Sequence, residues 1–133
     1  MAKRPKRIRV LIADDHSLFA QALQAILSTD KRFTTVGLAK DGLEAIALAE
    51  TLEPDVVLMD ISMPTLDGFA ATKEITKRVP ETAVLMLTGS NARSDVNRAR
   101  SAGAASYITK DRIAGELIDA ILERAVSPGL QTT

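Results

Sequence analysis

The sequence predicts an α/β fold in which a doubly wound, five-stranded parallel sheet carries helices on both faces. Between residues 8 and 126, short apolar or β-branched runs alternate five times with longer segments of helical periodicity. Parallel strands need crossover connections, which helices provide with nearly constant right-handedness. The strand-forming runs are apolar throughout, as strands covered on both faces require. The common order for such a sheet is 2-1-3-4-5, with ligands at the carboxyl ends of the strands.

Two strand–helix pairs make up the first part of the predicted sheet. A buried strand is expected over residues 8–13, where Arg9 is the one polar residue. Residues 17–28 are expected to form a helix, whose polar side chains are Ser17, Gln21, Gln24 and Ser28. A second strand follows at residues 33–39, and the turn Asp41-Gly42 opens a helix that runs to about residue 51.

Prolines and glycines delimit the other three strand–helix pairs. A third strand is expected over residues 56–59 and ends at Asp60, and a helix near residues 67–78 is stopped by Pro80. Gly103 breaks the helix before the fifth strand. The later strands and helices are expected at residues 82–87, 92–102, 104–109 and 113–126.

The composition describes one globular domain and excludes several kinds of site. A chain of 133 residues, with 46% hydrophobic residues, can form one domain without a disulfide or a structural metal. The absence of cysteine excludes thiolate zinc sites and cysteine nucleophiles, and it fits a reducing compartment. The single histidine, His16, argues against a serine–histidine triad and against a multi-histidine metal site.

The charges are balanced overall but unevenly distributed. Lysine and arginine number 17, as do aspartate and glutamate, so the chain offers no strong field for nucleic acid or an anionic membrane. Five basic residues lie within residues 3–9, so the rest of the chain carries a net negative charge. We therefore expect a basic tail (1–7), one domain (8–126) and a C-terminal tail or linker start (127–133). No apolar run suits a membrane span or a signal peptide, which predicts a cytoplasmic protein.

Five polar side chains are expected at the carboxyl ends of four neighbouring strands. Asp14 and Asp15 follow the first strand, and Asp60, Thr88 and Lys110 end the third, fourth and fifth. Adjacent strands lie roughly 4.8 Å apart, so these side chains can converge. Three carboxylates within about 4 Å repel by a few kcal/mol per pair, and a cation would offset that cost. Oxygen ligands without thiolates select a hard cation, and Mg²⁺ fits better than Ca²⁺.

The same five residues carry the groups that phosphoryl transfer needs. A carboxylate can attack phosphorus and form an acyl phosphate, and Asp60 is the central acid. Asp14 and Asp15 would hold the cation. Lys110 would pair with the phosphoryl oxygens or with Asp60, and Thr88 would donate a hydrogen bond to a phosphoryl oxygen.

Each residue taken alone also has a structural explanation. Asp14 or Asp15 could cap the first helix, and Thr88 begins an ordinary turn sequence. Tyr107 is explained as a half-buried strand residue, and His16 as the residue that opens the first helix, without a catalytic role. Helix capping and turn chemistry do not predict the joint occurrence of acids, a hydroxyl and a lysine at four strand ends.

Several segments together resemble the receiver domain of two-component response regulators, which has a flavodoxin-like fold. The resemblance covers residues 8 to about 126. It rests on Leu11-Ile12-Ala13-Asp14-Asp15-His16, Asp55-Val56-Val57-Leu58-Met59-Asp60-Ile61-Ser62-Met63-Pro64 with Asp67-Gly68, Leu87-Thr88, Gly103-Ala104 and Tyr107-Ile108-Thr109-Lys110. The strings Asp-Asp-His, Met-Asp-Ile-Ser-Met-Pro and Lys-Asp resemble the NarL/LuxR-type branch in particular.

The resemblance implies a phosphorylation site and a magnesium site. Asp60 would accept a phosphoryl group from a histidine of a sensor histidine kinase. Asp14, Asp15, Asp60 and the backbone carbonyl of Ser62 would coordinate Mg²⁺. The chain would then be a signalling switch and not an enzyme, with only its own phosphorylation and dephosphorylation as chemistry.

The resemblance also implies how the phosphoryl group would be read. Thr88 and Tyr107 would form a switch pair that biases a surface made by the fourth helix, fifth strand and fifth helix. Ser62 and Ser90, two residues beyond the acceptor and the switch hydroxyl, would tune dephosphorylation. A homodimer in the phosphorylated state is a further implied possibility.

Two features depart from the family. Asp111 follows Lys110 where many receivers have proline, so a cis-proline linkage is absent at this position. NarL/LuxR-type regulators carry a DNA-binding helix-turn-helix domain after the receiver, whereas this chain stops at Thr133. We expect no direct nucleic-acid binding by this chain. Transcription regulation would act through an output domain that has been removed or was never present.

The helix over residues 17–28 is expected to keep one apolar flank exposed. Its polar residues fall within an arc of about 60°, so some of Phe19, Leu23 and Leu27 would contact a partner. The family commonly docks its kinase there. The alternative is that the last helix covers this flank.

Two other functions fit parts of the pattern. A magnesium-dependent phosphatase acting on other substrates would also use Asp60, but Ser62 stands where it needs a second acid. A phosphorylation-independent interaction module would not need the complete set of acids. Rossmann and P-loop sites are excluded because neither glycine pattern occurs.

Overall fold

The computed structural model describes residues 7–89 and 93–126 and contains one parallel sheet in the predicted order β2-β1-β3-β4-β5. The strands are β1 (Ile8–Ala13), β2 (Phe33–Ala39), β3 (Val56–Asp60), β4 (Ala83–Thr88) and β5 (Ser106–Thr109). The helices are α1 (Ser17–Ser28), α2 (Gly42–Leu52), α3 (Gly68–Arg78), α4 (Arg93–Ala102) and α5 (Ile113–Val126), with a 3-10 turn, η1 (Lys110–Arg112), before α5. The expected basic tail up to residue 6, Ser90 and the C-terminal tail lie outside the described residues.

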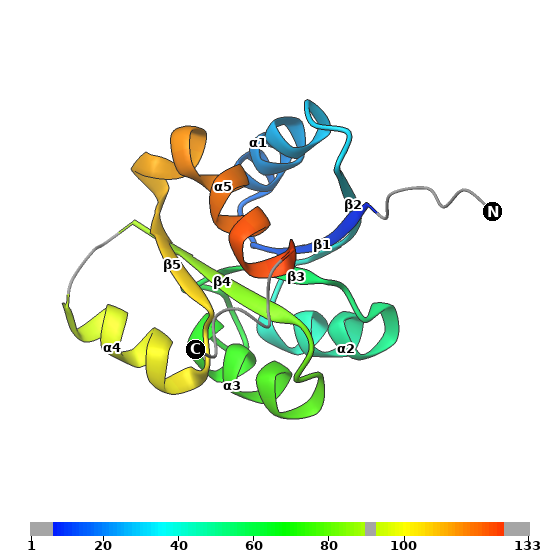
Figure 1. Cartoon of the computed structure of the whole chain (residues 1–133). Helices are drawn as coiled ribbons and strands as arrows, with labels where there is room; N and C mark the ends of the chain where they lie inside the picture. Colours follow the sequence, from blue (N-terminus) through cyan, green and yellow to red (C-terminus); the bar gives the residue numbers. More distant parts are fainter. Residues whose placement is uncertain (1–6, 90–92, 127–133) are drawn as a thin grey trace.

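The sheet is the middle layer of three. Figure 1 shows α1 and α5 on one face and α2, α3 and α4 on the other. Side chains of β1 alternate between the two cores: Val10 and Ile12 pack under α1 and α5, whereas Leu11 and Ala13 pack under the other helices. Across residues 7–89 and 93–126, no helix combines the length and apolarity that crossing a membrane requires.

The edge strand β2 corrects the expectation that all strands are apolar throughout. It pairs with β1 alone, and its buried residues are the two at its ends, Phe33 and Ala39. Thr34 and Thr35 are only partly buried. An edge strand is covered less completely than a central one, and its side chains can therefore be polar.

Local hydrogen bonds and backbone geometry shift some element starts from their predicted places. Asp67 caps α3 by accepting a hydrogen bond of 2.9 Å from the Ala70 N–H, so the helix begins at Gly68, one residue later than predicted. Gly103 adopts a φ of 98° after α4. The chain then needs two more residues before it joins the sheet, and β5 begins at Ser106 instead of residue 104.

The apolar flank of α1 is buried. Leu23 and Leu27 are 0% and 1% exposed and share a core with Leu117 and Ile121 of α5. Phe19 is partly buried against the same core. The expectation of partner contact is therefore wrong for Leu23 and Leu27, and the alternative of cover by α5 is correct. A helix that packs on a sheet and on a neighbouring helix buries a wider arc than one contact would.

Leu18 is the exception on α1, because its side chain is 81% exposed. We expect Leu18→Gln to change the free energy of unfolding by less than about 0.5 kcal/mol, since little of this side chain is buried on folding and glutamine is also a good helix former. Urea denaturation monitored by circular dichroism measures the change. A loss above about 1 kcal/mol would contradict an exposed position.

Candidate functional site

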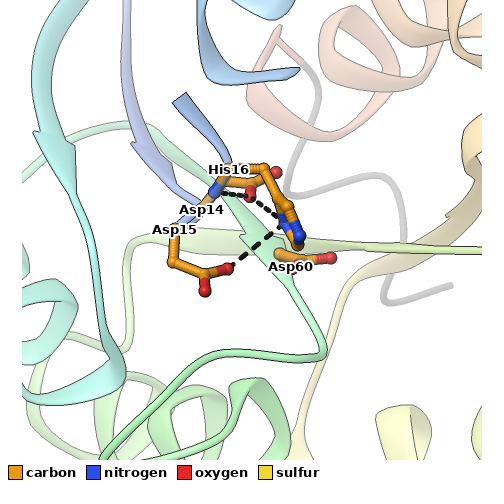
Figure 2. A group of neighbouring side chains, drawn as sticks. All are labelled: Asp14, Asp15, His16 and Asp60. Carbon is orange, nitrogen blue, oxygen red and sulfur yellow. Dashed lines mark hydrogen bonds and ion pairs between the residues drawn. The ribbon is translucent and has the colours of Figure 1, made fainter. Parts of the chain in front are cut away.

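The predicted acids meet at the carboxyl edge of the sheet. In the parallel register of β1 with β3, the last paired residues are Ala13 and Met59. Asp14 and Asp60 directly follow this pair, so the two acids lie at the same level on neighbouring strands. Figure 2 shows Asp14, Asp15 and Asp60 grouped around the ring of His16. One ligand atom from each of these four residues lies within 4.8 Å of the other three. The structure thus gathers three acids that are separated by up to 46 positions in the sequence.

Lys110 reaches this group from the end of β5. Its Nζ atom lies 3.1 Å from Oδ1 of Asp60, which is itself 3% exposed. The same ammonium lies 4.4 Å from the centre of the Phe19 ring on α1. A cation–π contact of this kind contributes about 0.5–1 kcal/mol and holds the ammonium beside the acid. Phe19 therefore has a role at the site that the sequence did not indicate.

Two carboxylate oxygens in the group are buried without a hydrogen-bond partner among the described residues, namely Oδ2 of Asp14 and Oδ2 of Asp60. Such orphaned acceptors are rare and costly in folded proteins. Burial, followed by the charge of Asp14, raises the pKa of the Asp60 carboxyl, and Lys110 only partly opposes them. A hard divalent cation would satisfy both oxygens, so the donor set fits Mg²⁺.

The raised pKa of Asp60 predicts a pH-dependent stability when no divalent cation is present. A carboxyl with a raised pKa in the folded state favours folding at acidic pH, and this contribution is lost as pH rises through that pKa. Relative to Asp60→Asn, wild type should therefore lose stability as pH rises from acidic to neutral. Urea denaturation in EDTA measures the difference. The exposed Glu81→Gln is the control, and equal slopes for wild type and Asp60→Asn would contradict the expectation.

His16 belongs to the acidic group, although the sequence predicted only that it opens the first helix. Its Nδ1 atom lies 3.3 Å from Oδ1 of Asp14 and 3.3 Å from Oδ1 of Asp15. As expected, His16 occupies the cap position of α1, but its side chain makes no capping hydrogen bond there. Its backbone N–H donates to Oδ1 of Asp14 over 2.8 Å. The sequence held one indication of this position. His16 directly follows Asp14 and Asp15, and a residue next to two converging acids must lie close to them.

The loop after β3 lines the open side of the site. Asp15, His16 and the exposed Ser62 border an open pocket of about 510 Å³. Arg98 of α4 also borders it and lies 4.0 Å from the centre of the Phe69 ring. Nothing in the sequence pattern indicated this guanidinium. It places a positive charge at the rim of an otherwise acidic pocket.

The two residues of the expected switch pair lie on neighbouring strands. Thr88 ends β4 and is 5% exposed. Tyr107 of β5 is partly buried against the core under α2, α3 and α4. It also borders a pocket with Lys110, Val96 of α4 and Glu116 of α5. The aromatic side chain thus lies where α4, β5 and α5 meet, close in sequence to the lysine that contacts Asp60.

Known proteins resemble this chain in both sequence and fold. The sequence pattern of the response regulator receiver domain matches residues 10–122. The chain is 42% identical over 114 residues to the response regulator protein VraR of Staphylococcus aureus, covering 86% of this chain and 54% of that protein. It is 37% identical over 115 residues to the transcriptional regulatory protein DegU of Brevibacillus brevis, covering 86% and 49%. The chain spans about half the length of these curated relatives.

Solved structures are similar over nearly the whole chain. The signal receiver domain of a response regulator named NarL from Mycobacterium tuberculosis has a TM-score of 0.87 and 33% identity, covering 92% of this chain and 98% of that one. A DNA-binding response regulator of the LuxR family from Staphylococcus aureus has a TM-score of 0.81 and 27% identity, covering 87% and 97%. Fold and sequence therefore point to the same group of proteins.

Proposed function

This chain belongs to the response regulator receiver family, in its NarL/LuxR branch, and from that premise we propose that it is a phosphorylation-controlled switch of a two-component system. Asp60 accepts a phosphoryl group from a sensor histidine kinase in a Mg²⁺-dependent reaction. The observation that carries this proposal is the buried Asp60 carboxylate, with one oxygen 3.1 Å from Lys110 and the other without a partner among the described residues. One oxygen is paired with an ammonium, and the lone pairs of the other are unsatisfied by the described residues.

The residues around Asp60 support a direct phosphoryl transfer. An Asp60 oxygen attacks the phosphorus of the kinase phosphohistidine, a P–O bond forms, and the P–N bond breaks as the imidazole leaves. Asp14, Asp15, Asp60 and the backbone carbonyl of Ser62 would hold Mg²⁺, which when bound offsets negative charge on the phosphoryl oxygens. Lys110 stabilises the same developing charge from the side of β5.

Thr88 and Tyr107 are the residues proposed to respond to the phosphoryl group. The hydroxyl of Thr88 would donate to a phosphoryl oxygen, and the ring of Tyr107 would follow it inward. Tyr107 borders a pocket with Val96 of α4 and Glu116 of α5, so its movement would change that surface. Such a change is a population shift, driven by contacts that exist in one state only.

Several finer features of the proposal follow the family. Ser62 and Ser90 have small side chains at the positions that tune dephosphorylation in the family, and they would set the lifetime of the acyl phosphate. Output would be transcriptional, through a helix-turn-helix domain in a longer protein, and phosphorylation would favour a homodimer. The lack of cysteine fits a reducing compartment, and we place this signalling in the cytoplasm.

Intact-mass measurement after incubation with Mg²⁺ and acetyl phosphate tests the function. Wild type should gain one phosphoryl group that is stable in acid and labile in base, and Asp60→Asn should gain none. Asp111→Asn, which removes an exposed acid next to Lys110, should behave as wild type. Equal labelling of Asp60→Asn would overturn the proposal. Repeated turnover of phosphate esters would favour a phosphatase instead.

A further inference from the structure

His16, the single histidine of the chain, lies against the acidic group, and the chain contains no cysteine. The Nδ1 atom of His16 faces one carboxylate oxygen of Asp14 and one of Asp15, and Figure 2 shows the ring beside Asp60 as well. With His16, the donor set of the pocket contains nitrogen as well as oxygen. A metal site of this composition differs from an all-oxygen magnesium site in the ions that it prefers.

The distances at His16 suit ligands of one ion. Charge-assisted N–H···O bonds are usually about 2.7–2.9 Å long, whereas Nδ1 lies 3.3 Å from each of the two oxygens. Two ligands bound at about 2.0 Å to one tetrahedral Zn²⁺ lie about 3.3 Å apart. Moreover, Nδ1 carries at most one proton and cannot make a full hydrogen bond to both carboxylates.

A second observation also points to an ion in this pocket. Oδ2 of Asp14 and Oδ2 of Asp60 are buried without a partner in the described part of the chain. Both residues belong to the same group, in which one ligand atom from each member lies within 4.8 Å of the others. The pocket therefore gathers at least four donor atoms, two of them from residues under 5% exposed.

We propose that this pocket binds Zn²⁺, and related transition-metal dications, through His16 together with Asp14, Asp15 and Asp60, in competition with Mg²⁺. The inference rests on the proposed magnesium site and adds a nitrogen ligand to it. Zn²⁺ binds imidazole and carboxylate readily in tetrahedral sites, whereas Mg²⁺ prefers oxygen and retains waters.

The single histidine makes the test direct. In untagged protein, long-range ¹H–¹⁵N correlation spectra report only one imidazole, and its Nδ1 resonance should shift when Zn²⁺ is added. Isothermal titration calorimetry should show that wild type binds Zn²⁺ at least about 100-fold more tightly than Mg²⁺. Mg²⁺ should leave the imidazole resonances nearly unchanged.

Two variants isolate the contribution of His16. His16→Ala and His16→Asn should each lower the Zn²⁺ affinity at least about 10-fold, because even outer partners of metal ligands contribute that much. Their Mg²⁺ affinity should change less than about twofold, since the oxygen ligands remain. Asparagine is a common cap residue, so His16→Asn preserves the start of α1.

Zn²⁺ affinity that is equal in wild type and both variants would overturn the inference, as would an unshifted imidazole or the absence of Zn²⁺ binding. The two proposals fail separately. A chain that is phosphorylated on Asp60 but binds Zn²⁺ without His16 loses only this inference. A chain that binds Zn²⁺ through His16 but accepts no phosphoryl group loses only the signalling function.

Discussion

Lys110→Met should slow the Mg²⁺-dependent phosphorylation by acetyl phosphate at least about 100-fold. The Lys110 ammonium lies 3.1 Å from the Asp60 carboxylate and is held there by the Phe19 ring at 4.4 Å. Negative charge on the phosphoryl oxygens is redistributed as Asp60 attacks, and a fixed ammonium stabilises that charge without reorganisation. Methionine keeps the length of the side chain and removes its charge. Time courses of intact mass measure the rate.

Two measurements separate this electrostatic effect from damage to the fold. Lys77→Met removes the same charge from an exposed position in the last turn of α3 and should leave the rate within about twofold of wild type. Lys110→Met should bind Mg²⁺ more tightly than wild type, because a positive charge leaves the carboxylate cluster. A wild-type rate in Lys110→Met would contradict the role of Lys110. Loss of both rate and Mg²⁺ binding would indicate a collapsed site.

The order of strands and helices could be predicted for two reasons. Each element has its own spacing of apolar residues, and several elements are bounded by proline or glycine. The predicted bounds of β1 and α5 agree with the structure to the residue. The 3-10 turn Lys110–Arg112 could not be predicted, because its three residues are all charged and carry no apolar period. It depends on how β5 leads into α5, and that geometry is set by packing.

The acids of the site could be predicted because parallel strands end at one edge of a sheet. The contacts around them could not, since they depend on how helices approach that edge. His16 meets the acids through the start of α1, and Arg98 reaches the rim from α4. Likewise, the burial of Leu23 and Leu27 follows from the position of α5 beside α1, which the period of one helix does not specify.

Gly68→Ala should lower the free energy of unfolding by about 3 kcal/mol, because no side chain fits between α3 and the end of β3. A Cβ atom on Gly68 would lie 2.2 Å from the carbonyl oxygen of Asp60 and 2.9 Å from the Cα of Ile61. Both neighbours are backbone, which cannot rotate away as a side chain would. The Gly68 N–H also donates to the Ile61 carbonyl over 2.9 Å, and this bond ties the helix to the strand end.

The same substitution should slow phosphorylation about 100-fold, since a displacement of about 1 Å at a reacting group has effects of this size. Gly115→Ala in α5 is the matched control, because a Cβ there meets nothing within 4 Å. It should raise the free energy of unfolding by about 0.5–1 kcal/mol and leave the phosphorylation rate unchanged. Urea denaturation and intact mass measure the two effects. Wild-type stability in Gly68→Ala would contradict the close contact between the start of α3 and the backbone of Asp60. The acceptor would then be positioned by β3 alone.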